Sequence, residues 1–170
     1  MISPEEALHI ILDRSIDFGI EEVSFLKAQN RVLKEDILAD RDLPPFNRVS
    51  MDGIAINYDA FKKGIRNFSI EGIQAAGSVQ LHLNDPDHCL EVMTGAVLPE
   101  NTDTVIRYED VTINEGGATI NLETVEKSQN VHHKGKDRKL NDILIRKNTL
   151  ISAAEIGILS TVGKSNVKVA

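Results

Sequence analysis

The stretch VTINEGGATINL, residues 111–122, is the clearest guide to the fold of this chain. Two short runs in which apolar and polar residues alternate flank a pair of glycines, Gly116 and Gly117. Alternation is typical of a strand with one buried face, and glycine adopts the positive φ angles of tight hairpin turns. The pattern therefore predicts a β-hairpin with both glycines in its turn.

The same pattern extends through residues 54–125, where short alternating runs are separated by turn clusters. The runs are IAIN, FSIEGI, VQLHL, CLEVM, TVIRYEDVTI and ATINLETV, and the clusters are AAGS, NDPD, PENTD and NEGG. Many short strands with frequent turns are typical of a compact all-β unit, either a barrel or a sandwich. We expect such a unit over residues 48–125.

The segments on either side of this unit carry helix signals. Near the N-terminus, Ser3 and Glu6 match a capping box, Pro4 suits the first helical turn, and Gly19 ends the segment. Near the C-terminus a second capping box precedes an apolar run, with Ser152 as cap, Glu155 as its partner and Gly163 as terminator. Both patterns predict helices.

The fold class follows from these signals and from short strands expected at EEVSFL, ILI and SNVKVA. We predict a chain that is mainly β with a few helices (α+β). A compact β-barrel-like unit, residues 48–125, is inserted in a small mixed α/β unit, which is discontinuous and formed by residues 1–47 and 126–170.

Composition argues against several functions. The net charge of −7 disfavours binding to nucleic acid or to an anionic membrane, and aromatic residues, which stack on single-stranded nucleic acid, make up 4% of the chain. No apolar run approaches the length of a membrane span, and the acidic start MISPEEAL is unlike a signal peptide. Cys89 is the only cysteine, which favours a reducing cytoplasm, and its apolar neighbours predict a buried, unreactive thiol.

The segment DLPPFNRVSMDGIAI, residues 42–56, contains a candidate binding loop. Pro44 and Pro45 exclude a helix, and Asp52 and Gly53 follow at the mouth of an apolar strand. Asp-Gly is a common turn pair, so Asp52 has a purely structural interpretation. The alternative is that a rigid loop presents the Asp52 carboxylate to a ligand.

A second candidate is VMTGAVLPE, residues 92–100, in which Thr94 and Gly95 follow a strand. A hydroxyl and a closely approachable backbone can bind an anion or a polar ring. The same residues can also form an ordinary turn, in which the threonine hydroxyl bonds its own backbone. Sequence reasoning leaves both interpretations open.

A third candidate is VHHKGKDRK, residues 131–139, where several cations surround Asp137 in an otherwise acidic chain. It is either a solvated loop or an anion-binding loop in which Gly135 permits close backbone approach. His132 and His133 would point to opposite faces of a strand, so we do not expect them to share a metal.

In their order and content, these segments resemble one family. DLPPFNRVSMDGIAI, EVMTGAVLPENTDTVIRYED and NVHHKGKDRKLNDILIRKNTLISAAEIGILSTVG are similar to the N-terminal region of the MoeA/gephyrin family, the molybdopterin molybdenumtransferases of molybdenum-cofactor biosynthesis. The likeness spans nearly the whole chain, from SPEEAL to the final strand.

The resemblance implies that the whole protein inserts molybdate into adenylated molybdopterin and releases AMP, using a divalent cation such as Mg²⁺. It also implies a homodimer whose active site lies between the N-terminal module of one subunit and the α/β domain of the other. That domain is missing from the 170 residues, which stop in the strand pattern SNVKVA. We therefore expect a fragment that binds no Mg²⁺ or molybdate by itself; the alternative is a non-catalytic dimerisation or interaction module.

The resemblance also implies site residues. Asp52 in MDG, Thr94 in MTGA and Asp137 in the G-x-D loop match the family's motifs and would help to hold or polarise the pterin phosphate, metal or molybdate. The substrate-binding positions implied are Ser50, Gly53, Gly95, His132 and Gly135, and no metal ligand is assigned. The chain departs from the family pattern where NRVSMDG replaces DNSAMDG and where VHHKGKD replaces a loop such as IRPAGED.

Overall fold

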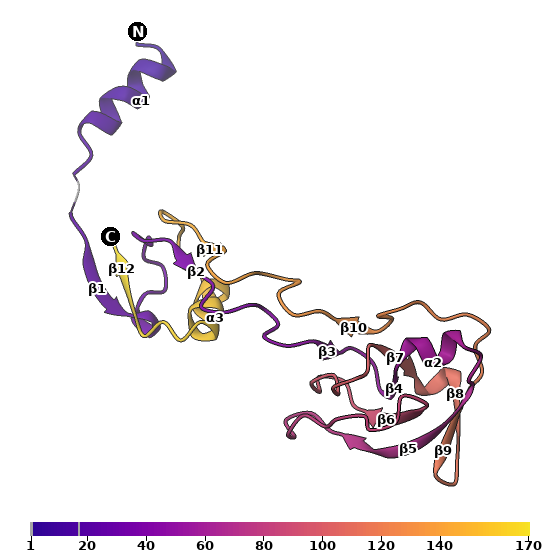
Figure 1. Ribbon diagram of the computed structural model, residues 1–170. Helices are drawn as coiled ribbons and strands as arrows, with labels where there is room; N and C mark the ends of the chain where they lie inside the picture. Colours follow the sequence, from indigo (N-terminus) through magenta and orange to yellow (C-terminus); the bar gives the residue numbers. More distant parts are fainter. Residues whose placement is uncertain (1, 17) are drawn as a thin grey trace. The chain divides into compact units, whose positions relative to one another are not determined.

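The computed structural model describes residues 2–16 and 18–170, which form two units (Figure 1). The larger unit comprises residues 41–140, and the smaller one combines the chain up to Asp40 with residues 141–170. The larger unit therefore begins before and ends after the range predicted from sequence, residues 48–125.

The extra residues, 41–47 and 126–140, group with the larger unit because they pair with each other. Strand β3 (Arg48–Val49) pairs antiparallel with β10 (Val131–His132). Just before β3, the Leu43 N–H donates to the Arg138 carbonyl at 2.8 Å. A sequence pattern read segment by segment does not reveal such a pairing. That each unit folds independently stays a prediction.

A six-stranded sheet forms the larger unit and curls into a half-barrel (Figure 1). Its strand order is β7-β4-β6-β5-β9-β8; β5 and β6 run parallel, and all other neighbours are antiparallel. The strands are β4 (Gly53–Ile56), β5 (Asn67–Gln74), β6 (His88–Val92), β7 (Thr104–Arg107), β8 (Val111–Asn114) and β9 (Gly117–Ile120). The unit also contains helix α2 (Tyr58–Lys62) and the 3₁₀ turn η2 (Tyr108–Asp110). The prediction of a mainly β chain with a few helices is confirmed.

Strand β4, an interior strand of the sheet, is buried on both faces, which makes it a firm support for the residues that precede it. Ile54 and Ile56 join a core cluster that includes Phe61 of α2. Ala55, which points to the opposite face, packs in a second cluster with Val49 of β3. Burial on both faces explains why GIAI reads as a continuous apolar run rather than an alternating one.

The predicted hairpin is confirmed, with one correction to its turn. Strands β8 and β9 pair antiparallel, and Asn114 faces Gly117 across the pair. Glu115 and Gly116 therefore form the connection, and Gly116 has a φ of +75°. Gly117 already lies in β9, so a single glycine supplies the turn geometry.

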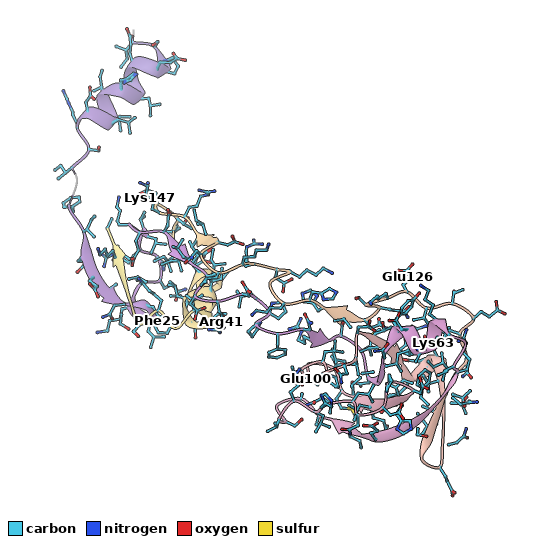
Figure 2. All side chains as sticks on the ribbon, viewed as in Figure 1. Phe25, Arg41, Lys63, Glu100, Glu126 and Lys147 are labelled. Atoms are coloured by element: carbon cyan, nitrogen blue, oxygen red, sulfur yellow. The ribbon has the colours of Figure 1, made fainter. Side chains whose placement is uncertain are left out.

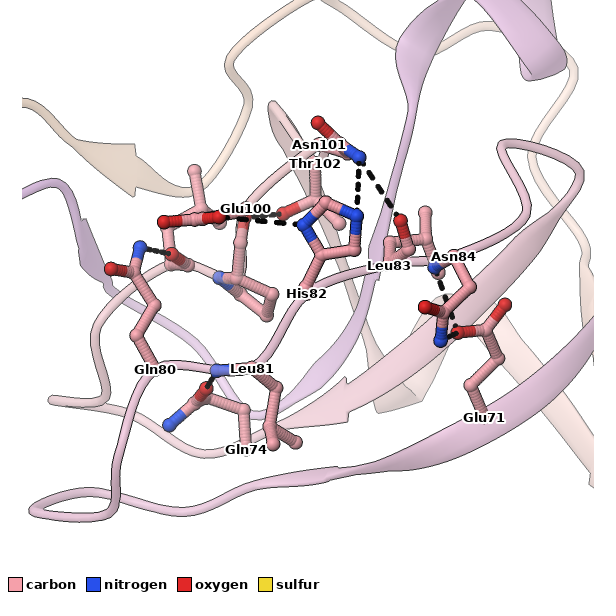
Figure 3. Close-up of polar contacts among 12 residues, drawn as sticks. Glu71, Gln74, Gln80, Leu81, His82, Leu83, Asn84, Glu100, Asn101 and Thr102 are labelled. Atoms are coloured by element: carbon pink, nitrogen blue, oxygen red, sulfur yellow. Dashed lines mark hydrogen bonds and ion pairs between the residues drawn. The ribbon is translucent and has the colours of Figure 1, made fainter.

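The segment VQLHL, in contrast, forms no regular strand. Within residues 79–83 the structure has one isolated bridge, between His82 and Glu100. Side chains provide most of the remaining anchoring bonds of this segment, as Figure 3 shows for Gln74 and Gln80. The alternating pattern therefore correctly predicted an extended segment, but it did not predict how that segment is bonded to its neighbours.

The smaller unit contains the remaining elements. They are helices α1 (Pro4–Asp13) and α3 (Ala153–Thr161), the 3₁₀ turn η1 (Phe25–Lys27), and strands β1 (Glu21–Ser24), β2 (Ile37–Leu38), β11 (Ile143–Ile145) and β12 (Asn166–Val169). β1 pairs with β12 and β2 with β11, both antiparallel. Leu33, Ile151 and Leu159 are among the fully buried residues of its core.

Both predicted capping boxes are present, at Ser3 with Glu6 and at Ser152 with Glu155. Helix α1 nevertheless ends at Asp13, short of the predicted end at Gly19, and no residue of α1 is buried. Capping therefore defines where this helix begins, whereas no residue of its apolar face is buried within the described part of the chain.

Figure 2 shows the side chains gathered within each unit, with the exposed charged residues Lys63, Glu100 and Glu126 labelled on the larger one. Among the described residues, no helix is both long and apolar enough to span a bilayer.

Cys89 is fully buried in the core, and burial, with the charges of Glu91 and Glu71, raises the pKa of its thiol to about 12. The predicted burial of this thiol is confirmed.

Glu71 on β5 anchors the loop that leads into β6. Its carboxylate accepts hydrogen bonds from the backbone N–H groups of Asn84 and Asp85, both at 2.9 Å, and lies 3.1 Å from His88 Nδ1. These donors, the Asn84 N–H first, lower the pKa of Glu71 from 4.5 to about 2, although burial acts in the opposite direction. The fold thus favours the charged form.

Acid should therefore destabilise the protein partly because it protonates the Glu71 carboxylate. The stabilisation is fully present above pH 4.5, the ordinary pKa, and is lost as the pH falls towards 2, the pKa in the folded state. Glu71→Gln cannot ionise, so we expect a lower melting temperature at pH 7 and a shallower fall on acidification than in the wild type. Thermal melting from pH 7 to pH 2 measures both, and parallel curves would contradict the assignment.

Candidate functional site

Asp52 and Thr94, two of the predicted site residues, lie in direct contact although 42 positions separate them. The Thr94 backbone N–H donates to Asp52 Oδ1 at 2.6 Å. This bond, and a further one from the Thr94 side chain, lowers the pKa of the Asp52 carboxyl. Both residues are exposed. The loop thus holds an ionised carboxylate at the surface while part of its hydrogen-bonding capacity stays available to a ligand.

Gly53 is needed here for a reason that differs from the sequence interpretation. It does not have a positive φ; it is the first residue of β4, paired with Val92 on one side and Arg107 on the other. A Cβ at this position would overlap the Ile106 carbonyl oxygen and would lie 2.7 Å from the Arg107 Cα. Close packing of two backbones, not turn geometry, therefore requires the glycine after Asp52.

Tyr108 and Glu91 lie beside this carboxylate. The Tyr108 N–H donates to the Asp52 carbonyl at 3.1 Å, and the Tyr108 hydroxyl donates to Glu91 Oε2 at 2.6 Å. Burial raises the pKa of Tyr108, and so do its contact with Glu91 and the charge of Asp52. Tyr108 is therefore a neutral hydrogen-bonding group next to the site, and the sequence interpretation did not identify it.

The turn that carries Thr94 is held from a second direction by β3. The Gly95 N–H donates to the Val49 carbonyl at 2.9 Å, and the Val49 N–H donates to the Ala96 carbonyl at 2.9 Å. Gly95 has a φ of +87°, a conformation that favours glycine. The predicted binding residue Ser50 follows β3 and donates its hydroxyl to the Asn130 carbonyl at 2.8 Å. In this structure Ser50 therefore ties two segments together.

The third predicted catalytic position, Asp137, pairs with His132. The distance between His132 Nε2 and Asp137 Oδ1 is 2.8 Å. His132 pairs with Arg48 of strand β3. Asp52 follows β3 closely in the sequence, so this strand connects the His132–Asp137 pair with the Asp52–Thr94 pair. The structure thus gathers the predicted side chains into two pairs on one unit, Asp52 with Thr94 and His132 with Asp137.

The loop around Asp137 is anchored rather than free, and residues of DLPPFNRVSMDG anchor it. The Gly135 N–H donates to the Pro44 carbonyl at 3.0 Å, and Gly135 has a φ of +70°. Asn47 Oδ1 accepts the Lys134 N–H at 3.0 Å, and Asp42 Oδ1 accepts the Leu140 N–H at 3.0 Å. Asp42 and Asn47 stand in the quoted motif, yet their sequence context gave no sign of this role.

The described residues do not themselves form a metal centre. No group of three or more histidine, cysteine, aspartate or glutamate side chains comes close enough in this part of the molecule to hold a metal ion. Asp137 is already paired with His132, and Asp52 with Thr94.

Solved proteins with this architecture define its class. Two structures of the molybdopterin biosynthesis MoeA protein from Pyrococcus horikoshii superpose on 97% of the chain, with TM-scores of 0.82 and 0.88 and identities of 31% and 28%. The chain matches 43% and 45% of those structures. Residues 2–163 match the family described as MoeA N-terminal region (domain I and II). The chain therefore belongs to the MoeA family.

Curated relatives extend this result. The molybdopterin molybdenumtransferase of Synechocystis is 38% identical over 99% of the chain, and that of Haemophilus influenzae is 30% identical over 87%. The chain covers 44% and 36% of those two proteins. It thus spans less than half the length of these relatives.

Proposed function

We propose that this chain is the N-terminal part of a molybdopterin molybdenumtransferase of molybdenum-cofactor biosynthesis. In this proposal the whole, cytoplasmic protein inserts molybdate into adenylated molybdopterin and releases AMP, with Mg²⁺ as the divalent cation. The larger unit contributes Asp52, Thr94 and Asp137, and a homodimer completes the active site with the α/β domain of the other subunit. The names of the relatives support the activity, and the family match supports the placement of the chain within it.

The observation that carries this proposal is the Asp52–Thr94 contact. Two exposed residues from separate motifs are joined by a 2.6 Å hydrogen bond at the entrance to a strand buried on both faces. A turn needs no ionised carboxylate that is exposed and held rigidly, whereas a polar substrate does. The carboxylate can accept hydrogen bonds from the substrate, and the Thr94 hydroxyl, which donates a hydrogen bond to Asp52, adds an oxygen that can accept.

We expect these 170 residues to show no molybdate insertion when purified alone. Catalysis of this kind depends on several preorganised polar and metal contacts, and the chain covers less than half of its transferase relatives. The assay measures molybdenum cofactor formed from adenylated molybdopterin, molybdate and Mg²⁺, for the chain and for the whole protein. Turnover by the chain above background would contradict this expectation.

The same assay distinguishes the second candidate, a non-catalytic dimerisation or interaction module. The substituted loop VHHKGKD favours that alternative, because its Asp137 is already paired with His132. Activity of the whole protein supports the transferase. An inactive but well-folded and dimeric whole protein would support the module.

A further inference from the structure

Gln74, the last residue of β5, is a fully buried polar side chain outside the predicted site. Its Nε2 donates to Ser78 Oγ at 2.7 Å and to the Val79 carbonyl at 3.2 Å. Its Oε1 accepts the Leu81 N–H at 2.6 Å (Figure 3). No buried side-chain nitrogen or oxygen in the described residues lacks a partner. A fully satisfied buried amide of this kind specifies one arrangement of the segment that it binds.

The segment held in this way is the loop Ala75–Val79, which is exposed along its length. Its far end is anchored as well, because Gln80 Nε2 donates to the Leu98 carbonyl at 2.8 Å and Asn101 Nδ2 donates to the Leu83 carbonyl at 3.1 Å (Figure 3). A loop anchored at both ends keeps its position although its outer surface faces solvent.

This loop lies against the turn that carries Thr94. The Gln74 carbonyl accepts the Met93 N–H at 3.2 Å, and a Cβ built on Gly95 would touch the Ala76 Cβ at 3.9 Å. Gln74 therefore contacts both elements: its side chain holds the loop, and its backbone holds the start of the Met93–Ala96 turn. The loop sequence, AAGSV, contains no charged residue.

We propose that Gln74 is a positioning residue that holds the loop Ala75–Val79 beside Gly95, so that the loop forms one wall of the Asp52–Thr94 site. This inference rests on the proposed function, since it assumes that the site binds the molybdopterin substrate. An uncharged wall beside a carboxylate suits the ring system of the substrate rather than its phosphate, because Asp52 would repel a phosphate and the loop offers no cation to offset that repulsion. The wall therefore contributes to binding, whereas Asp52 contributes polar contacts.

The test compares Gln74→Met with Glu71→Met. Both residues lie on β5 and bind a neighbouring loop through side-chain hydrogen bonds, but Glu71 holds residues 84 and 85, in the loop that leads into β6. Ser78→Ala is a milder second variant, because Ser78 is exposed and loses only its bonds with Gln74 and Ala75. Amide hydrogen exchange is measured by NMR on the chain, and kcat and KM are measured on the whole protein.

We expect Gln74→Met and Ser78→Ala to accelerate exchange at Thr94 and Gly95 and to raise KM for adenylated molybdopterin, roughly tenfold for Gln74→Met, with kcat little changed. Glu71→Met should lower the melting temperature without either effect. Unchanged exchange at Thr94 and Gly95 in both test variants, or equal changes in the Glu71 control, would overturn the inference. If the wild-type whole protein inserts no molybdate, the proposed function itself fails; an active wild type whose Gln74 and Ser78 variants keep the normal KM overturns this inference alone.

Discussion

Gly53→Ala should destabilise the larger unit by about 3 kcal/mol or more, which corresponds to a fall of roughly 10 °C in melting temperature. The new methyl group would collide with the Ile106 carbonyl and approach the Arg107 Cα to 2.7 Å. Both are backbone atoms of β7, which pairs with β4, so neither can move aside as a flexible side chain could. Relief of the overlap requires β4 and β7 to separate next to the fully buried Ile54 and Ile106.

Gly72→Ala is the matched control for this experiment. Gly72 lies in β5 of the same sheet, and a Cβ there would make ordinary contacts with the Leu90 and Leu81 side chains at 3.5 and 3.9 Å. We expect this variant to melt close to the wild type. Equal melting temperatures for Gly53→Ala and Gly72→Ala would show that β4 and β7 are not packed as described.

Asp52→Asn should lower the activity of the whole protein about tenfold to a thousandfold, a loss of about 1–4 kcal/mol of transition-state stabilisation, with little change in stability. Asparagine is nearly isosteric and suits the same turn, and its amide oxygen can still accept the Thr94 N–H. The substitution therefore removes the negative charge and leaves the scaffold in place. Rates of cofactor formation and thermal melting are measured on the same preparation.

Asp85→Asn controls for loss of a surface charge. The Asp85 carboxylate is also exposed and also accepts a backbone N–H, from Asp87 at 2.9 Å, but it lies outside the candidate site. We expect normal rates for this variant. If Asp52→Asn retains full activity, or loses activity only in proportion to a large fall in melting temperature, Asp52 has the purely structural role of a turn residue.

Local patterns in the sequence predicted the elements well. Capping boxes at Ser3 and Ser152 and the hairpin around Gly116 depend on residues within a few positions of one another, so their geometry is encoded locally. Predictions that depend on pairing were weaker. VQLHL has a strand pattern, but it is held through side chains such as Gln74, and the boundary of the larger unit follows the β3–β10 pair.

The candidate site shows the same division. The motifs pointed to Asp52, Thr94, His132 and Asp137, but the roles assigned to them come from family resemblance and stay predictions. Which of them meet is a property of the fold: the structure pairs Asp52 with Thr94 and His132 with Asp137. Tyr108 and Asn47 carry no recognisable signal, because their partners Glu91 and Lys134 lie 17 and 87 positions away in the sequence. Gln74 binds nearby residues, but only the fold shows that its side chain is fully buried.

By itself, the sequence determined that the chain is mainly β, where its capped helices begin, and which short polar segments interrupt its strands. Only the tertiary structure decided why Gly53 follows Asp52. Turn propensity is local and suggested a flexible backbone, whereas the requirement for glycine comes from Ile106, a residue 53 positions away whose carbonyl leaves no room for a Cβ. Periodicity and capping act over a few residues; contact between strands depends on how the whole unit closes around its core.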